Sequence, residues 1–187
     1  MLSNASYRIV FVGDSSTGKS CLFHRLSTSQ FLAFSSTTVN VAFRKFEIFP
    51  GHFVSFLDTA GCETFRALSK SFYREAKIAL ILYDVTRFDS YDNVRTWHEN
   101  IINETPDAKI IILGNKSDLL ETDQAPNWTE GIKEEHMLIS AKSGHNIDRL
   151  LERIRELYTE DVTKDDISKS EELLQVDEEE DTSICRC

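Results

Sequence analysis

The chain has little of what would build a disulfide-bonded, metal-bound or membrane-spanning protein. Its 187 residues include four cysteines, at positions 21, 62, 185 and 187, and five histidines, at positions 24, 52, 98, 136 and 145. So few cysteines argue against a disulfide framework, and the scattered histidines lack the spacing of a zinc site. No apolar run approaches the roughly 20 residues that a membrane-spanning helix needs. We therefore expect a cytosolic protein with a hydrophobic core of its own.

Recognisable targeting signals are also lacking at the N-terminus. The opening Met1-Leu2-Ser3 does not begin a charged and apolar signal sequence. The second residue is leucine, whereas N-myristoylation requires glycine at that position. Any membrane attachment is therefore expected to come from elsewhere in the chain.

Basic residues are scarce, and the acidic excess is concentrated at the C-terminal end. The chain has 21 Lys and Arg against 31 Asp and Glu, a formal net charge of -10. Ten of the acids and three of the bases lie in residues 161–187. This balance disfavours nucleic acid as a partner, and so polar a segment cannot bury enough apolar surface to fold. We expect a globular domain over residues 1–160 and an acidic, disordered tail over residues 161–187.

A glycine-containing run at residues 13–20 follows an apolar stretch at residues 7–12 that predicts a buried strand. The run Gly-Asp-Ser-Ser-Thr-Gly-Lys-Ser has the spacing of a phosphate-binding loop, in which backbone N–H groups and a helix N-terminus surround an anion. Lys19 would reach the terminal phosphates, and the Ser20 hydroxyl would ligate Mg²⁺. The alternative is a simple turn between a strand and a helix. The predicted nucleotide contacts here are Ser15, Ser16, Thr17, Gly18, Lys19, Ser20 and Cys21.

Two further segments have the residues needed to recognise a base. The apolar run at residues 110–114 delivers Asn115-Lys116-Ser117-Asp118 at its end, where ligands of open α/β sheets bind. The Asp118 carboxylate can accept hydrogen bonds from two adjacent donors, which guanine offers and adenine does not. This favours GTP over ATP, although the segment alone could be a polar turn. The remaining predicted base contacts are Asn115 and Lys116, together with Ser140, Ala141 and Lys142, whose backbone N–H groups can meet the guanine carbonyl.

A candidate magnesium ligand stands at the end of a third apolar stretch. Asp58 directly follows residues 53–57 and begins the sequence Asp-Thr-Ala-Gly. Its carboxylate can hold Mg²⁺, through a water molecule because this ion dehydrates reluctantly, while the Gly61 N–H is placed to meet a γ-phosphate.

Taken in this order, the motifs resemble those of the small GTPases of the Ras superfamily over residues 7–160. The resemblance implies a P-loop G domain of the α/β class: a mostly parallel, six-stranded sheet with one antiparallel edge strand and helices on both faces. Apolar runs that alternate with amphipathic helical patterns, among them a helix expected at about residues 90–103, agree with such a sheet. The resemblance also implies that Thr38, or failing that Thr37, completes the Mg²⁺ shell. It further implies that Phe31 packs on the guanine, unless that ring belongs to the core.

The Rab branch is the most similar. Residues 38–43 resemble its threonine-to-phenylalanine segment, residues 71–76 resemble its aromatic-arginine-glycine-alanine segment, and Cys185-Arg186-Cys187 resembles its doubly geranylgeranylated ending. A metal-binding pair or a disulfide is the alternative for the two terminal cysteines. The resemblance implies effectors, an exchange factor and an activating protein that bind near residues 31–76. It also implies that prenylation machinery and a dissociation inhibitor bind the C-terminus, and that geranylgeranyl groups provide the membrane anchor.

The chain departs from the family pattern in several places, of which Cys62 is the most consequential. The family usually has glutamine there, which orients the attacking water, and a thiol cannot replace its amide. We therefore predict slow GTP hydrolysis, with Lys19, Thr38, Gly61 and Cys62 as the catalytic set. Ser16 and Glu75 replace common glycines. The loop between residues 116 and 140 is short, which predicts a helix reduced to a turn or two around residues 129–135.

Three functions are compatible with these features. The first is a GTP/GDP-regulated switch in vesicle trafficking, in the cytosol and on the cytoplasmic face of endomembranes, with GTP or GDP and Mg²⁺ as cofactors. The second is a GTP-locked membrane docking module with negligible hydrolysis, which Cys62 favours. The third, an ATP-dependent phosphotransferase, is weakened by the guanine-type residues 115–118 and by the absence of a substrate domain.

Overall fold

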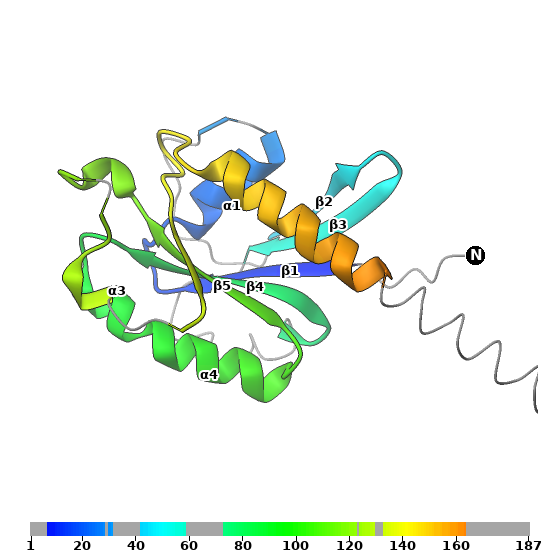
Figure 1. Ribbon diagram of the computed structural model, residues 1–187, viewed down its shortest axis with the longest axis horizontal. Helices are drawn as coiled ribbons and strands as arrows, with labels where there is room; N and C mark the ends of the chain where they lie inside the picture. The colour runs from blue at the N-terminus through cyan, green and yellow to red at the C-terminus, as the bar shows by residue number, and fades with distance from the viewer. Residues whose placement is uncertain are drawn as a thin grey trace, which may run out of the picture. The chain divides into compact units, whose positions relative to one another are not determined.

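The computed structural model describes residues 7–28, 30–31, 42–58, 73–122, 124–129 and 133–163. The described part of the chain up to Leu151 contains strands, helices and short 3-10 turns (Figure 1). They are β1 (Tyr7–Gly13), α1 (Lys19–Thr28), β2 (Ala42–Phe49), β3 (His52–Asp58), β4 (Ala76–Asp84), α3 (Phe88–Asp92), α4 (Val94–Glu104), β5 (Lys109–Asn115), the 3-10 turns η2 (Ser117–Leu119) and η3 (Asn127–Thr129), and β6 (Glu135–Leu138). A last helix spans residues 147–163, and a second compact unit begins within it at Glu152. None of the helices in the described ranges could cross a membrane.

The six strands form one sheet in the order β2-β3-β1-β4-β5-β6. Strand β2 is antiparallel to β3, and every other neighbouring pair is parallel. Parallel strands that are covered on both faces need continuous apolar sequence, and eight of the nine residues of β4 are buried. The mostly parallel sheet with one antiparallel edge strand is therefore confirmed.

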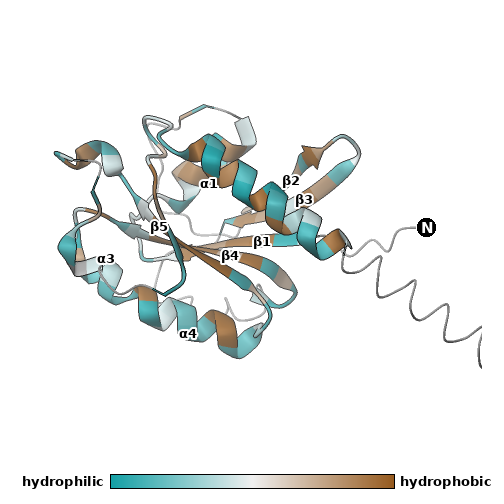
Figure 2. Ribbon diagram, viewed as in Figure 1, coloured by the Kyte–Doolittle hydropathy of each residue, from teal (hydrophilic) through white to brown (hydrophobic). Residues whose placement is uncertain are grey.

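Helices cover both faces of this sheet. Successive side chains of a strand point to opposite faces, so β1 contributes to two layers. Val10 and Val12 belong to a buried cluster with Trp97 of α4, whereas the Phe11 ring packs edge-on against Phe23 of α1, with ring centroids 6.0 Å apart. Figure 2 shows the central strands as hydrophobic over most of their length, while α4 carries both hydrophobic and hydrophilic residues.

The turn after β1 depends on backbone angles that favour glycine. Gly13 has φ +135°, and a Cβ atom there would lie 2.2 Å from the Leu82 carbonyl oxygen, so no other residue fits. Ser16 and Glu75, which replace the family's common glycines, also have positive φ angles, 65° and 64°. Both residues thus hold the left-handed conformation that glycine adopts without steric cost.

Some element boundaries differ from those expected. The helix expected at about residues 90–103 is divided into α3 and α4 at Asn93, which keeps helical angles (φ -74°, ψ -12°) while its amide bonds to Asp14. In the short loop before β6, the described helical turn is η3, at residues 127–129. The helical turn expected around residues 129–135 does not extend to Glu135, because Glu135 belongs to β6 and pairs with Ile111.

Candidate nucleotide-binding site

The loop between β1 and α1 wraps around the buried amine of Lys19. The Lys19 Nζ atom donates to the carbonyl oxygens of Gly13, at 2.9 Å, and Asp14, at 2.7 Å. Burial lowers the pKa of Lys19 to about 8, although the nearby carboxylates of Asp58 and Asp14 oppose this shift. The Thr17 hydroxyl also donates to the Asp14 carbonyl, at 2.9 Å. The loop and its lysine are thus held in a fixed arrangement.

Side chains of the α3–α4 region hold the same loop from outside. The Asp14 carboxylate accepts one hydrogen bond from the Trp97 indole, at 2.9 Å, and one from the Asn93 amide, at 2.7 Å. Arg87 donates to the Ser15 carbonyl at 3.4 Å. Sequence reasoning missed these contacts. The signal that could have found them is the buried indole N–H of α4, which requires an acceptor.

Asp58 lies at the end of β3 beside the loop, and it has the character of a cation ligand. The residue is 2% exposed, and its Oδ1 atom is a buried oxygen that has no hydrogen-bond partner within the described part of the chain. Burial raises the pKa of Asp58, while a hydrogen bond with the Ser20 side chain and the charge of Lys19 act in the opposite direction. An unsatisfied buried carboxylate oxygen next to a hydroxyl fits a hard cation that prefers oxygen ligands, such as Mg²⁺. Ser20 and Asp58 therefore suit the predicted ion.

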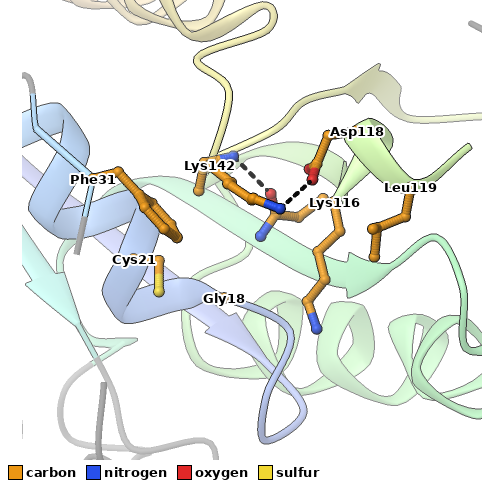
Figure 3. A pocket seen from close by; sticks show the side chains of 9 residues that line it. Gly18, Cys21, Phe31, Lys116, Asp118, Leu119 and Lys142 are labelled. Carbon is orange, nitrogen blue, oxygen red and sulfur yellow. Dashed lines mark hydrogen bonds and ion pairs between the residues drawn. The ribbon is translucent and has the colours of Figure 1, made fainter. Parts of the chain in front are cut away.

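A pocket of about 160 Å³ opens beyond the loop, at the C-terminal ends of β5 and β6 (Figure 3). Its walls come from α1, from the segments that follow β5 and β6, and from Phe31, which is 37% exposed. The lining residues are Gly18, Cys21, Phe31, Asn115, Lys116, Asp118, Leu119, Ala141 and Lys142. Eight of these nine residues were predicted from the sequence as nucleotide contacts; Leu119 was not.

Asn115 connects the phosphate loop to the segment after β6. Its amide Nδ2 donates to the Thr17 carbonyl at 2.8 Å, and its Oδ1 accepts from the Ala141 backbone N–H at 3.0 Å. The residue is 2% exposed, so both bonds are shielded from water. The Ala141 N–H, one of the groups considered for a guanine carbonyl, is therefore engaged by Asn115.

Asp118 faces the same pocket with a partly satisfied carboxylate. Its Oδ1 accepts from the Ser140 hydroxyl at 2.6 Å, and its Oδ2 lies 3.6 Å from the Lys142 amine. A carboxylate has about four lone-pair directions, so these partners leave acceptor capacity for a pair of donors. The arrangement suits a base that presents two adjacent N–H groups.

Lys116 is fixed by a residue that the sequence did not single out. Its amine lies 2.7 Å from the Asp84 carboxylate, which also accepts from the Thr86 N–H and hydroxyl. Burial would raise the pKa of Asp84, but the bonds from Lys116 and Thr86 prevail and leave this pKa below its usual value. Lys116 has φ 68°, a strained conformation for a residue with a side chain. Because Asp84 and Lys116 are 32 positions apart, no local pattern connects them.

Several predicted site residues lie outside the described part of the chain. They are Thr38 and its alternative Thr37, Gly61 and Cys62, and the terminal Cys185 and Cys187. The structure brings the other predicted residues together along one edge of the sheet, in the loop after β1 and at the ends of β3, β5 and β6.

The loop after β1 has the sequence of a phosphate-binding loop, and a pocket suited to a base lies next to it at the carboxyl ends of parallel strands. This combination defines a P-loop nucleotide-binding domain. The family model described as "Ras family" matches residues 8–160. Ras-related protein RABA1c of Arabidopsis thaliana is 34% identical over 151 residues, which cover 76% of this chain and 70% of that protein. Ras-related protein Rab-19 of Xenopus laevis is 36% identical over 155 residues, covering 77% and 72%. The chain belongs to the Ras family and is a Rab-like small GTPase.

Proposed function

We propose that this chain is a GTP/GDP-regulated switch in vesicle trafficking that hydrolyses GTP slowly. The observation that carries the guanine assignment is the Asp118 carboxylate, which faces the pocket with acceptor capacity for two donors. Membership of a family of small GTPases supports the same nucleotide. The switch would recruit partners in its GTP-bound state and release them after hydrolysis.

The proposed chemistry is attack by water on the γ-phosphate. Mg²⁺, when bound, neutralises charge on the β- and γ-phosphates. Ser20 and Thr38 would ligate the ion, and Asp58 would hold it through water. Lys19 would stabilise the charge that develops on the phosphates, and the Gly61 N–H would contact the γ-phosphate. No activated side-chain nucleophile is required in this scheme.

Slow hydrolysis is proposed from Cys62, which stands where the family usually has glutamine. Unassisted turnover with the standard active site is on the order of 10⁻⁴ per second, so a slower protein would remain in its GTP-bound form for hours. Taken to its limit, this becomes the second candidate, a GTP-locked membrane docking module with negligible hydrolysis. Cys62 favours both candidate functions, which differ only in the rate of GTP hydrolysis.

Single-turnover GTP hydrolysis with Mg²⁺ tests the proposal by comparing the wild-type chain with Cys62→Gln. A slow but measurable wild-type rate that glutamine raises supports the slow switch. A wild-type rate indistinguishable from zero supports the docking module. Equal rates in the two proteins would show that Cys62 does not limit hydrolysis and would overturn the slow-turnover proposal.

Membrane attachment is proposed to come from geranylgeranyl groups on Cys185 and Cys187, at the end of an acidic tail over residues 161–187. Two such chains suffice for stable anchoring without a basic patch. Effectors, an exchange factor and an activating protein are proposed to bind near residues 31–76. The hairpin of β2 and β3 exposes three phenylalanine side chains, Phe43, Phe49 and Phe53, which support a partner surface there. Loss of the vesicle-bound fraction in a doubly serine-substituted variant, Cys185→Ser with Cys187→Ser, would support the anchor.

A further inference from the structure

Arg25, in the last turn of α1, contacts two parts of the base pocket without lining the pocket itself. Its Nε atom donates to the Ala141 carbonyl, and its NH2 group donates to the Lys142 carbonyl at 2.6 Å. Its guanidinium carbon also lies 5.9 Å from the centre of the Phe31 ring. The two carbonyl partners are 116 and 117 positions away in the sequence, so one side chain bridges a helix, the segment after β6 and an aromatic wall.

The geometry of the bridge suits arginine and not lysine. The guanidinium is planar and presents several N–H donors in a fixed fork, so it can hold two neighbouring carbonyl oxygens at once. The segment after Lys142 approaches the same side chain closely: a Cβ atom on Gly144, which has φ +91°, would lie 3.4 Å from an Arg25 terminal nitrogen. Residues 141–144 therefore fold around the guanidinium.

Fixing the Ala141 carbonyl also fixes the direction of the next N–H group. The peptide bond between Ala141 and Lys142 is trans, so its C=O and its N–H point to opposite sides. With the carbonyl held on Arg25, the Lys142 N–H points away from Arg25. Lys142 lines the pocket and Arg25 does not, and the Ala141 N–H is already bonded to Asn115. Arg25 thereby determines which backbone donor a base carbonyl can meet.

We propose that Arg25 is a positioning residue for guanine: it orients the segment 140–142 toward the C6 carbonyl of the base and holds Phe31 at the pocket edge. This inference rests on the guanine-nucleotide binding proposed above. Removing Arg25 would loosen both walls of the pocket together, and the bound nucleotide would leave faster. Arg25 is not among the residues that line the pocket, so it would act on the base through the groups that it holds.

The test measures dissociation of fluorescently labelled GDP from the Mg²⁺-loaded full-length chain. Losing two charge-assisted hydrogen bonds is expected to raise the dissociation rate of Arg25→Met roughly ten- to a hundredfold. Arg25→Lys keeps the charge but not the fork, so its rate is expected to lie between those of wild type and Arg25→Met. The matched control is Arg95→Met on α4, whose side chain is 87% exposed and paired with Glu99; its rate is expected to equal that of wild type.

A second readout separates positioning from a general loss of stability. The diphosphate of 2-aminopurine riboside lacks the C6 carbonyl and the neighbouring N1–H but keeps the amino group and the phosphates. The missing N1–H affects its contact with Asp118 in wild type and variant alike, so the change in preference between the two proteins reports on the carbonyl. If Arg25 aims a donor at that carbonyl, the preference for GDP over this analogue is expected to fall in Arg25→Met. Equal weakening of both ligands would show that Arg25 only stabilises the fold and would overturn the inference. An unchanged dissociation rate in Arg25→Met and Arg25→Lys would overturn it as well.

Failure of the proposed function gives a different result. If the wild-type chain itself did not retain labelled GDP, guanine-nucleotide binding would be refuted, and with it the basis of the inference. If the wild-type chain retained GDP and both Arg25 variants behaved like it, only the role of Arg25 would be refuted.

Discussion

The base end and the phosphate end of this site are held together by different kinds of contact. At the base end, side chains bond to one another or to backbone across long sequence separations, as Asn115 does to Thr17 and Ala141. At the phosphate end, Trp97 and Asn93 also reach Asp14 from distant positions, but this end additionally buries two charged groups. Lys19 bonds to carbonyl oxygens of its own loop, and the Asp58 Oδ1 has no hydrogen-bond partner among the described residues. We therefore expect the base end to recognise the shape and donor pattern of a base, and the phosphate end to depend on charge. Binding at the base end should respond to small changes in donor or acceptor groups, whereas the phosphate end should respond to pH and ions.

The largest effect on nucleotide binding is expected from replacing one oxygen atom at the base end. In Asp118→Asn, an NH₂ group replaces one acceptor oxygen and faces the amino group of guanine. Affinity for GDP is expected to fall by about 3 kcal/mol, roughly a hundredfold, because a charged acceptor of two bonds is lost. Xanthosine diphosphate, which has a carbonyl in place of that amino group, is expected to bind better than GDP. Competition against labelled nucleotide measures both, and a retained preference for GDP would contradict the assignment.

The second effect concerns the link between the two ends. Asn115→Ala removes two buried hydrogen bonds and leaves the Thr17 carbonyl and the Ala141 N–H without a partner. The free energy of unfolding is expected to fall by about 3 kcal/mol. Urea denaturation measures this change, with Asn103→Ala, at an exposed position of α4, as the control. A loss as small as that of the control would show that the two ends are not joined through Asn115.

The third effect isolates charge at the phosphate end. Burial lowers the pKa of Lys19 to about 8 from its ordinary 10.5, so between these values the unfolded chain binds more protons than the folded one. The destabilisation is full below pH 8 and is relieved as the pH rises toward 10.5. The free energy of unfolding of the nucleotide-free protein, relative to that of Lys19→Met, is therefore expected to increase across this window. Denaturation at several pH values checks the sign; a flat or falling difference would contradict it.

The smallest effect is expected at Ser16, in the phosphate loop. Glycine would relieve the left-handed conformation but would also gain conformational entropy in the unfolded chain, and each term is about 1 kcal/mol with opposite sign. Ser16→Gly is therefore expected to change the free energy of unfolding by less than about 1 kcal/mol. Thermal denaturation alongside wild type measures it. A large loss would indicate that the serine side chain makes a contact that supports the loop.

Features that are contiguous in sequence could be predicted, and features that join distant segments could not. The loop after β1 and residues 115–118 follow their strands directly, so spacing and apolar runs were enough to place them. The bonds from Arg25 to Ala141, from Lys116 to Asp84 and from Trp97 to Asp14 span 116, 32 and 83 positions. Helix boundaries failed for a related reason: Asn93 divides α3 from α4 while its side chain serves the distant phosphate loop.

Because Trp97 donates a hydrogen bond to Asp14, we expect the intrinsic fluorescence of Trp97 to report nucleotide binding at the phosphate loop. The indole is 3% exposed, and its N–H is donated to a carboxylate of the very loop that surrounds Lys19. Indole emission responds to the local electric field, and phosphates at this loop would place several negative charges close to that carboxylate. The chain has only two tryptophans, so Trp128→Phe would leave Trp97 as the single emitter. Loading and release of an unlabelled nucleotide could then be followed in real time from the protein's own fluorescence.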